Sequence, residues 1–158
     1  MRKKILIGVS LVLATLIFCS IIFFVRANRP MSRAKKEAIE IAKEHTDLDQ
    51  VDRFYWYTRE NSYFTLVGTD QKDEAIIVII PQSGDKVTVL NQADGLTEEA
   101  ALQKVYETEN PNKVIKMNLG MHEGQPTWEV VAENEENRLD YYLVDFKTGE
   151  IVSSIKNI

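Results

Sequence analysis

The chain has 158 residues, of which 44% are hydrophobic and 27% charged, a composition that argues against disorder and suits one domain or two very small ones. The first 29 residues carry five basic residues and no acidic one, whereas the rest carries 14 basic and 24 acidic residues, a net charge of −10. Such acidity argues against nucleic acid and anionic lipid as ligands of the globular part, and leaves proteins, cationic ligands or metal as its partners.

A stretch of 21 uncharged residues, 5–25, follows the basic tip of the chain. As a helix rising about 1.5 Å per residue, it just crosses a hydrocarbon core of about 30 Å. The apolar region of a secretory signal is shorter, usually about 7 to 15 residues. We therefore expect residues 1–29 to form a cytoplasmic tip and a transmembrane anchor. Cleavage near Val25 and Ala27 is the alternative.

The orientation of this span is not fixed by charge, because basic residues flank it on both sides. A four-residue tail ahead of a long apolar stretch is typical of an uncleaved signal anchor, which predicts that the remainder is extracytoplasmic. The only cysteine, Cys19, lies inside the span, so the soluble part has no thiol for catalysis, metal or a disulfide. An exported part without disulfides suits the surface of a Gram-positive bacterium.

After Arg29 and Pro30 the pattern predicts one amphipathic helix of about 14 residues, with Ser32 as a possible N-cap. Short runs rich in β-branched and aromatic residues then predict four strands, separated by polar turns. In the first of these, Phe54 and Trp56 alternate with Tyr55 and Tyr57, so the two pairs point to opposite faces. The four predicted strands are 51–58, 63–68, 75–80 and 86–90.

The same series then begins again. Thr97 is a good N-cap for a second helix, Glu98 and Glu99 suit the positive end of its dipole, and Leu96 is placed to pack against its first turn. The sequence Asn110-Pro111 ends that helix. Four more strands are predicted at 113–119, 127–132, 139–145 and 151–155, with Trp128, Val130 and Ala132 on one side of the second.

Landmarks of the two halves align at an offset of 64 to 65 residues. Ser32 corresponds to Thr97, Phe64 to Trp128, and Gly84-Asp85 to Gly149-Glu150. Both glycines suit the residue at positive φ that closes a tight hairpin. The duplication predicts two α+β modules, each with one helix on a four-stranded antiparallel sheet whose other face is left to water or a partner. Because each module alone buries little surface, we expect the two to pack together or to share a continuous surface.

Three segments resemble the PepSY domain: "LTEEAA" at 96–101, "TWEVV" at 127–131 and "YYLVDFKTGEIV" at 141–152. With the anchor and a diverged upstream copy, nearly the whole chain resembles the TseB-like (YpmB-like) cell-wall elongation regulators of Gram-positive bacteria. In the upstream copy the usual Tyr-x-x-Asp-x-x-x-Gly pattern is replaced by Ile77, Ile80 and "PQSGD". The resemblance implies cystatin-like modules at 30–92, like the TseB amino-terminal domain, and at 93–158, the PepSY domain. It also implies a non-enzymatic, extracytoplasmic role and association with penicillin-binding proteins.

A search for chemical sites yields none that we expect to be catalytic, cofactor-binding or metal-binding. His45 and His122 lack further ligands at suitable spacing, and the acidic run 133–137 does not match a calcium loop and suits a solvated hairpin tip. Ser83, Ser153 and Ser154 lack a glycine elbow or a nearby histidine, while Asp145 and Glu150 suit the capping of the last turn.

Four tyrosines are the candidate partner-binding residues, with core packing as the competing interpretation: Tyr55, Tyr57, Tyr141 and Tyr142. The predicted function is a membrane-anchored adaptor or regulator of wall-synthesis enzymes. The alternative is an inhibitor or propeptide-like chaperone of an exported peptidase, because PepSY domains also resemble the prosegments of secreted metalloproteases.

Overall fold

The computed structural model describes residues 2–84 and 86–158, so Asp85 lies outside the described residues. The chain divides into two compact units, the first ending at Lys36 and the second comprising Glu37–Ile158. Helix α1 (Arg2–His45) runs through the first unit and ends in the second. Among the described residues it is the one helix long and apolar enough to cross a membrane. Exposed apolar side chains of the predicted span include Leu11, Phe18 and Phe23.

The predicted break between the anchor and the first module helix is wrong. Pro30 lies inside α1, and Ser32 is a helical residue and not an N-cap. A proline within a helix removes one backbone hydrogen bond, but the turns on both sides keep theirs, and a long helix can continue through it. The anchor and the first module helix are therefore one continuous element. The domain boundaries after residues 29 and 92 stay predictions.

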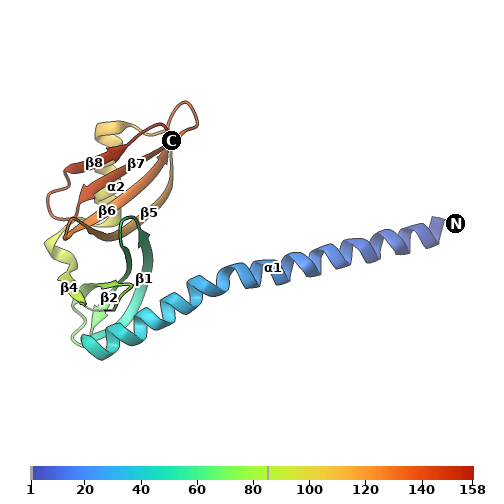
Figure 1. Cartoon of the computed structure of the whole chain (residues 1–158), viewed down its shortest axis with the longest axis horizontal. Helices are drawn as coiled ribbons and strands as arrows, with labels where there is room; N and C mark the ends of the chain where they lie inside the picture. The colour runs from blue at the N-terminus through green and yellow to red at the C-terminus, as the bar shows by residue number, and fades with distance from the viewer. Residues whose placement is uncertain (1, 85) are drawn as a thin grey trace. The chain divides into compact units, whose positions relative to one another are not determined.

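Two successive sheets form most of the second unit (Figure 1). The first contains β1 (Leu48–Thr58), β2 (Ser62–Asp70), β3 (Ala75–Pro81) and β4 (Thr88–Asn91). A 3-10 turn, η1 (Gln92–Asp94), leads to α2 (Glu98–Glu109). The second sheet contains β5 (Lys113–His122), β6 (Gln125–Glu133), β7 (Leu139–Asp145) and β8 (Ile151–Ile155). Both sheets are antiparallel with neighbouring strands in chain order, which confirms the predicted pair of modules.

Helix α2 begins and ends where its capping residues predict. The Thr97 hydroxyl accepts a hydrogen bond from the backbone N–H of Ala100 at 3.2 Å, with Glu98 and Glu99 in the first turn. At the other end Asn110 adopts the left-handed conformation, φ 46°, and its N–H donates to the carbonyl of Tyr106. The boundary residues named from sequence thus define this helix.

Each module has one helix on its sheet. In the second module Ala101 and Val105 of α2 are fully buried and share a core cluster with Trp128 and Val130 of β6. In the first module two alanines of α1, Ala38 and Ala42, lie one turn apart and are both fully buried. Side chains of the first sheet that are also fully buried include Leu66, Val78 and Ile80.

A single core cluster spans the two modules. Tyr55, Ile77 and Ile79 of the first module belong to the same buried cluster as Leu119 and Trp128 of the second. Neither sheet alone encloses this cluster, because its members come from both. The expectation that the modules pack together is therefore confirmed.

The last hairpin of each module closes on a glycine at positive φ, as predicted: φ is 79° at Gly84 and 75° at Gly149. In the second module the carboxylate of Asp145 caps the turn by accepting from the N–H groups of Lys147 at 2.9 Å and Thr148 at 2.7 Å. Glu150 contributes through its backbone, whose carbonyl accepts from the N–H of Asp145 at 2.8 Å. Local hydrogen bonding thus accounts for the carboxylate of Asp145 at this turn.

Candidate functional site: the junction between the modules

The first sheet meets the second along β5, which is an edge strand of its sheet. The hydroxyl of Thr65 on β2 donates a hydrogen bond of 2.6 Å to the carbonyl of Leu119 on β5, and both residues are fully buried. An edge strand leaves one row of backbone groups without a strand partner, so a buried edge needs side-chain partners. Thr65 supplies one, and the junction protects this edge of the PepSY-type sheet.

A glycine allows the ring of Tyr57 to lie against the backbone of β5. A Cβ atom added at Gly120 of β5 would lie 2.3 Å from Cγ of Tyr57. That separation is far below ordinary van der Waals contact, and the ring belongs to a side chain that is only 1% exposed. The Tyr57 ring therefore occupies the space that any other residue at position 120 would need.

One side of the junction contains a buried ion pair. Nε of Arg59 donates to Oε1 of Glu129 at 2.8 Å, and Nδ2 of Asn118 donates to Oε2 at 3.0 Å. The Glu129 side chain is 7% exposed and that of Arg59 is 19% exposed. A carboxylate this deeply buried needs both partners to offset its loss of hydration. The guanidinium of Arg59 also lies 5.9 Å from the ring centre of Tyr141.

The other side joins β1 to the start of α2. The hydroxyl of Tyr55 donates to Oε2 of Glu98 at 2.6 Å, and its ring meets Trp128 edge-on at 5.5 Å between ring centres. Arg53 pairs with Glu98 and also with Glu99, the latter at 3.3 Å. Burial first, and then the hydrogen bond to Glu98, raise the pKa of Tyr55 to about 12. Tyr55 therefore acts here as a neutral hydrogen-bond donor.

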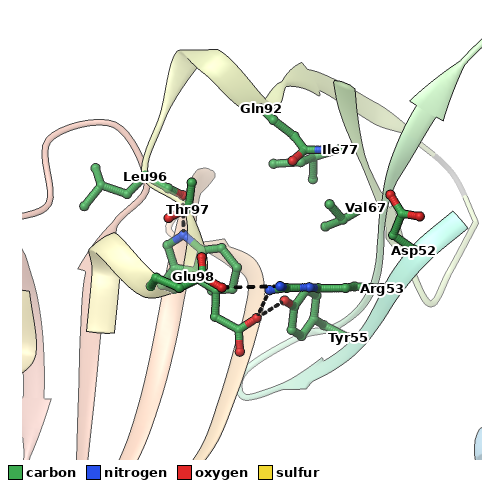
Figure 2. Close-up of a pocket in the computed structure, with 11 residues that line it drawn as sticks. Asp52, Arg53, Tyr55, Val67, Ile77, Gln92, Leu96, Thr97 and Glu98 are labelled. Atoms are coloured by element: carbon green, nitrogen blue, oxygen red, sulfur yellow. Dashed lines mark hydrogen bonds and ion pairs between the residues drawn. The ribbon is translucent and has the colours of Figure 1, made fainter. Parts of the chain in front are cut away.

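Beside this contact lies a cavity of about 380 Å³, which we call the junction pocket (Figure 2). Its residues come from β1, β2, β3, η1, α2 and β6, so both modules build it. Two of its polar groups are fixed: Nε2 of Gln92 donates to the carbonyl of Gly68 at 3.1 Å, and Nε1 of Trp128 donates to that of Leu96 at 3.0 Å. The residues that line it are Asp52, Arg53, Tyr55, Val67, Ile77, Gln92, Leu96, Thr97, Glu98, Glu99 and Trp128.

The pocket has an apolar interior and an acidic rim. Val67 and Ile77 lie next to each other in Figure 2, with Asp52 beyond them and Glu98 on the opposite side, whereas the side chain of Leu96 points away from them. Arg53 is the only cation among the lining residues. The pKa of the Glu99 carboxyl lies below its ordinary value, first because of its hydrogen bond to its own backbone N–H and then because of Arg53. The Glu99 carboxylate is thus ionised at neutral pH.

The four tyrosines named as candidate partner-binding residues differ in their exposure. Tyr55, Tyr57 and Tyr142 are 8%, 1% and 2% exposed, which favours the competing interpretation of core packing for these three. The first two face the second module, and Tyr142 belongs to the shared core cluster. The alternation pattern identified their common face on β1, but not that another module covers it. Tyr141 is partly exposed, and its role in partner binding stays a prediction.

A second cavity, of about 340 Å³, lies near the acidic turn between β6 and β7. Its buried carboxylate, Asp140, already accepts hydrogen bonds from Asn134, Tyr142 and the backbone N–H of Asn157. Among the described residues, no group of three or more histidine, cysteine, aspartate or glutamate residues is arranged to hold a metal ion. The polar groups at this turn satisfy one another.

Sequence reasoning missed the junction pocket. Glu98 and Glu99 were noted only for the helix dipole, and Asp52 and Arg53 were not singled out. The one available signal was the aromatic alternation of β1 next to these charges. Nothing in the sequence joins Arg53 to Glu98, which lie 45 positions apart.

Comparison with known proteins assigns a domain type to each module. Residues 37–81 match the model described as "Cell wall elongation regulator TseB-like domain", and residues 95–155 match "Peptidase propeptide and YPEB domain", the PepSY model. The matches occur in the order found in the structure, with the first in the upstream module. The chain thus contains a segment similar to the TseB-like domain, followed by a PepSY domain.

Two relatives from Bacillus subtilis extend this assignment. The protein described as "Probable cell wall elongation regulator TseB" (strain 168) is 28% identical over 162 residues, which covers 98% of this TseB-like chain and 99% of the relative. The solved structure of "YpmB protein from Bacillus subtilis" matches with a TM-score of 0.70 at 27% identity, covering 77% of this chain and 95% of that one. The two-module fold is therefore that of a known structure.

Proposed function

We propose that this TseB-like protein is a membrane-anchored, extracytoplasmic regulator of cell-wall synthesis that acts by binding a penicillin-binding protein. The observation that carries the proposal is the similarity, over nearly the whole length of both chains, to a probable cell wall elongation regulator. The apolar part of α1 supports the anchor, and the uncleaved-anchor layout of residues 1–29 supports an outside location for the modules.

Tethering suits a regulator that binds weakly. A chain confined to the membrane shares a thin layer with the enzymes anchored there, so its effective concentration is high without strong affinity. We propose that residues 1–29 anchor the protein in the membrane, and that the modules at 30–92 and 93–158 contact the partner enzyme.

We further propose that the protein is not an enzyme. The TseB-like and PepSY descriptions name a regulator and a propeptide. In the junction, the most buried carboxylate, that of Glu129, is bound on both oxygens by Arg59 and Asn118. Such groups hold the modules together and are not free for acid or base chemistry.

Co-purification tests the proposed partner. The tagged full chain would be isolated from detergent-solubilised membranes, with penicillin-binding proteins identified by a fluorescent penicillin. We expect one labelled enzyme in the eluate. A control protein carrying only residues 1–29 on an unrelated domain should not retain it. Absence of every labelled enzyme would contradict the proposed partner.

The second candidate is an inhibitor or chaperone of an exported peptidase. It is favoured by the match of residues 95–155 to a peptidase propeptide model. In this case a peptidase should co-purify, and its activity should fall when the purified chain is added.

Topology is tested separately on intact protoplasts. Protease added outside should remove the modules if they are extracytoplasmic, and a cytoplasmic protein should stay intact in the same sample. Protection of the modules would contradict the proposed location.

A further inference from the structure

We propose that the junction pocket receives one basic side chain, lysine or arginine, of the protein partner. This inference rests on the proposed function, since it assigns the contact site of the same regulator. The pocket lies within the second unit and is built from both modules. At about 380 Å³ it is within the size range of ligand sites and larger than one side chain needs.

The interior suits the stem of such a side chain. Val67 and Ile77 present aliphatic groups, and Trp128 adds an aromatic surface. Lysine and arginine bury their methylene groups on apolar surface while the charged end stays near water. A glutamate side chain of the partner would also have an aliphatic stem, but its negative charge would be repelled by the carboxylates of the rim.

The charges on the rim favour a cation. Asp52, Glu98 and Glu99 are carboxylates, and Arg53 offsets one of the three negative charges. The amino terminus of α2 contributes about half a positive charge more, which leaves a clear negative excess. The globular part as a whole is also acidic, with 24 acidic and 14 basic residues after position 29. Both the local and the overall field therefore attract a basic segment.

Asp52 is the carboxylate that remains available. Arg53 is committed to Glu98 and Glu99, and Tyr55 also donates to Glu98. Asp52 is exposed and has no hydrogen bond or ion pair from another side chain among the described residues. A basic group that enters the pocket gains an ion pair with Asp52 without breaking an existing contact.

The chain carries a built-in reporter for this site. It has two tryptophans, of which Trp128 lines the pocket. Trp56 does not line it and instead packs on Phe64 at 5.4 Å between ring centres. In the full chain labelled with 5-fluorotryptophan and held in non-ionic detergent, the fluorine signal of Trp128 reports the pocket and that of Trp56 is the internal reference.

Three blocked tripeptides serve as probes: acetyl-Gly-Lys-Gly-amide, the same peptide with norleucine, and the same peptide with glutamate. Norleucine keeps the aliphatic stem without the charge. We expect the lysine peptide to shift the Trp128 signal at millimolar concentration, the norleucine peptide to do so more weakly, and the glutamate peptide not at all. The Trp56 signal should not move.

The matched variants are Asp52→Lys and Asp49→Lys. Both residues are exposed on β1 and undergo the same charge reversal, but only Asp52 lines the pocket. Asp52→Lys should weaken the lysine peptide roughly 5- to 10-fold, as expected for reversing one partly exposed ion pair. Asp49→Lys should leave affinity within about two-fold. An unmoved Trp128 signal, equal shifts from all three peptides, or equal weakening by both variants would overturn the proposal.

Failure of this inference is separable from failure of the proposed function. If a penicillin-binding protein co-purifies equally with the wild-type chain and with Asp52→Lys, the pocket is not the contact site but the function stands. If the lysine peptide binds at Trp128 and no wall enzyme co-purifies, the pocket stands and the proposed partner is wrong.

Discussion

Two tyrosine hydroxyls of this protein are both buried, but they differ in hydrogen bonding. The hydroxyl of Tyr57 is buried and has no hydrogen-bond partner among the described residues. That of Tyr142 is also buried but donates to Oδ2 of Asp140 at 3.0 Å. An unsatisfied buried hydroxyl loses its hydration without compensation, whereas a satisfied one contributes to stability.

Replacing each tyrosine by phenylalanine therefore has opposite predicted effects. Tyr57→Phe should raise the free energy of unfolding by about 1 kcal/mol, and Tyr142→Phe should lower it by about 1 kcal/mol. Urea unfolding of the full chain in non-ionic detergent, followed by tryptophan fluorescence, measures both. A loss of stability in Tyr57→Phe would show that its hydroxyl is bonded after all, and would contradict the account of this side chain.

The two arginines of the junction differ in burial, so we expect them to contribute differently to the free energy of unfolding. Arg59→Ala leaves the carboxylate of Glu129 buried with Asn118 alone, and should cost about 3 kcal/mol of unfolding free energy. Arg53 is 49% exposed, so Arg53→Ala should cost at most about 1 kcal/mol. The double variant Arg59→Ala/Glu129→Gln should regain much of the loss because it removes the unpaired charge. Equal losses in the two single variants would contradict a buried pair at Glu129.

At the scale of elements, the contact between β5 and β1 depends on the absence of a side chain at Gly120. Gly120→Ala places a methyl group inside the space of the Tyr57 ring and should cost about 1 to 3 kcal/mol of unfolding free energy. Ile115→Ala is the control, since Ile115 lies on the same strand and is exposed, and it should change stability by less than about 0.5 kcal/mol. If both variants are equally stable, β1 does not press on β5 as the structure indicates.

The elements themselves were largely predictable from sequence, because their signals are local. The caps at Thr97 and Asn110 delimit α2, and the alternation in β6 places Trp128 and Val130 on the side of that helix. Gly84 and Gly149 mark the last turn of each module. The helix break at Pro30 was wrong, because proline weakens a helix without always ending it.

The junction was not predictable in the same way, because its contacts join residues far apart in the chain. Tyr55 bonds Glu98 across 43 positions, and Arg59 bonds Glu129 across 70. Alternation on β1 indicates which side chains share a face, but it does not indicate what covers that face. Sequence alone therefore left open whether Tyr55 and Tyr57 bind a partner or pack in a core. The junction pocket was missed because its walls come from both modules.

At the scale of the whole molecule, the shared core predicts that the two modules unfold together. Tyr55, Ile77 and Ile79 would lose most of their burial if the second module unfolded, so neither module is expected to survive alone. Trp56 lies in the first module and Trp128 in the second. Variants that keep only one tryptophan, Trp128→Phe and Trp56→Phe, each report one module.

Each variant should show a single urea transition when fluorescence is compared with far-ultraviolet circular dichroism of the same sample. The two signals should coincide in Trp128→Phe and also in Trp56→Phe. Fluorescence that changes at a lower urea concentration than circular dichroism in either variant would show that one module unfolds first, and would contradict a common core.

Site-specific cross-linking in growing cells tests most directly whether this TseB-like protein acts by touching a wall-synthesis enzyme at its junction pocket. A photoreactive benzoylphenylalanine would replace Glu99 on the rim of the pocket, which leaves Asp52 in place, or, as a control on the same helix, the exposed Gln103. Position 99 should yield an adduct that contains a penicillin-binding protein, and position 103 should yield little of it. An adduct with a peptidase, or the absence of any wall-synthesis enzyme at position 99, would contradict the account.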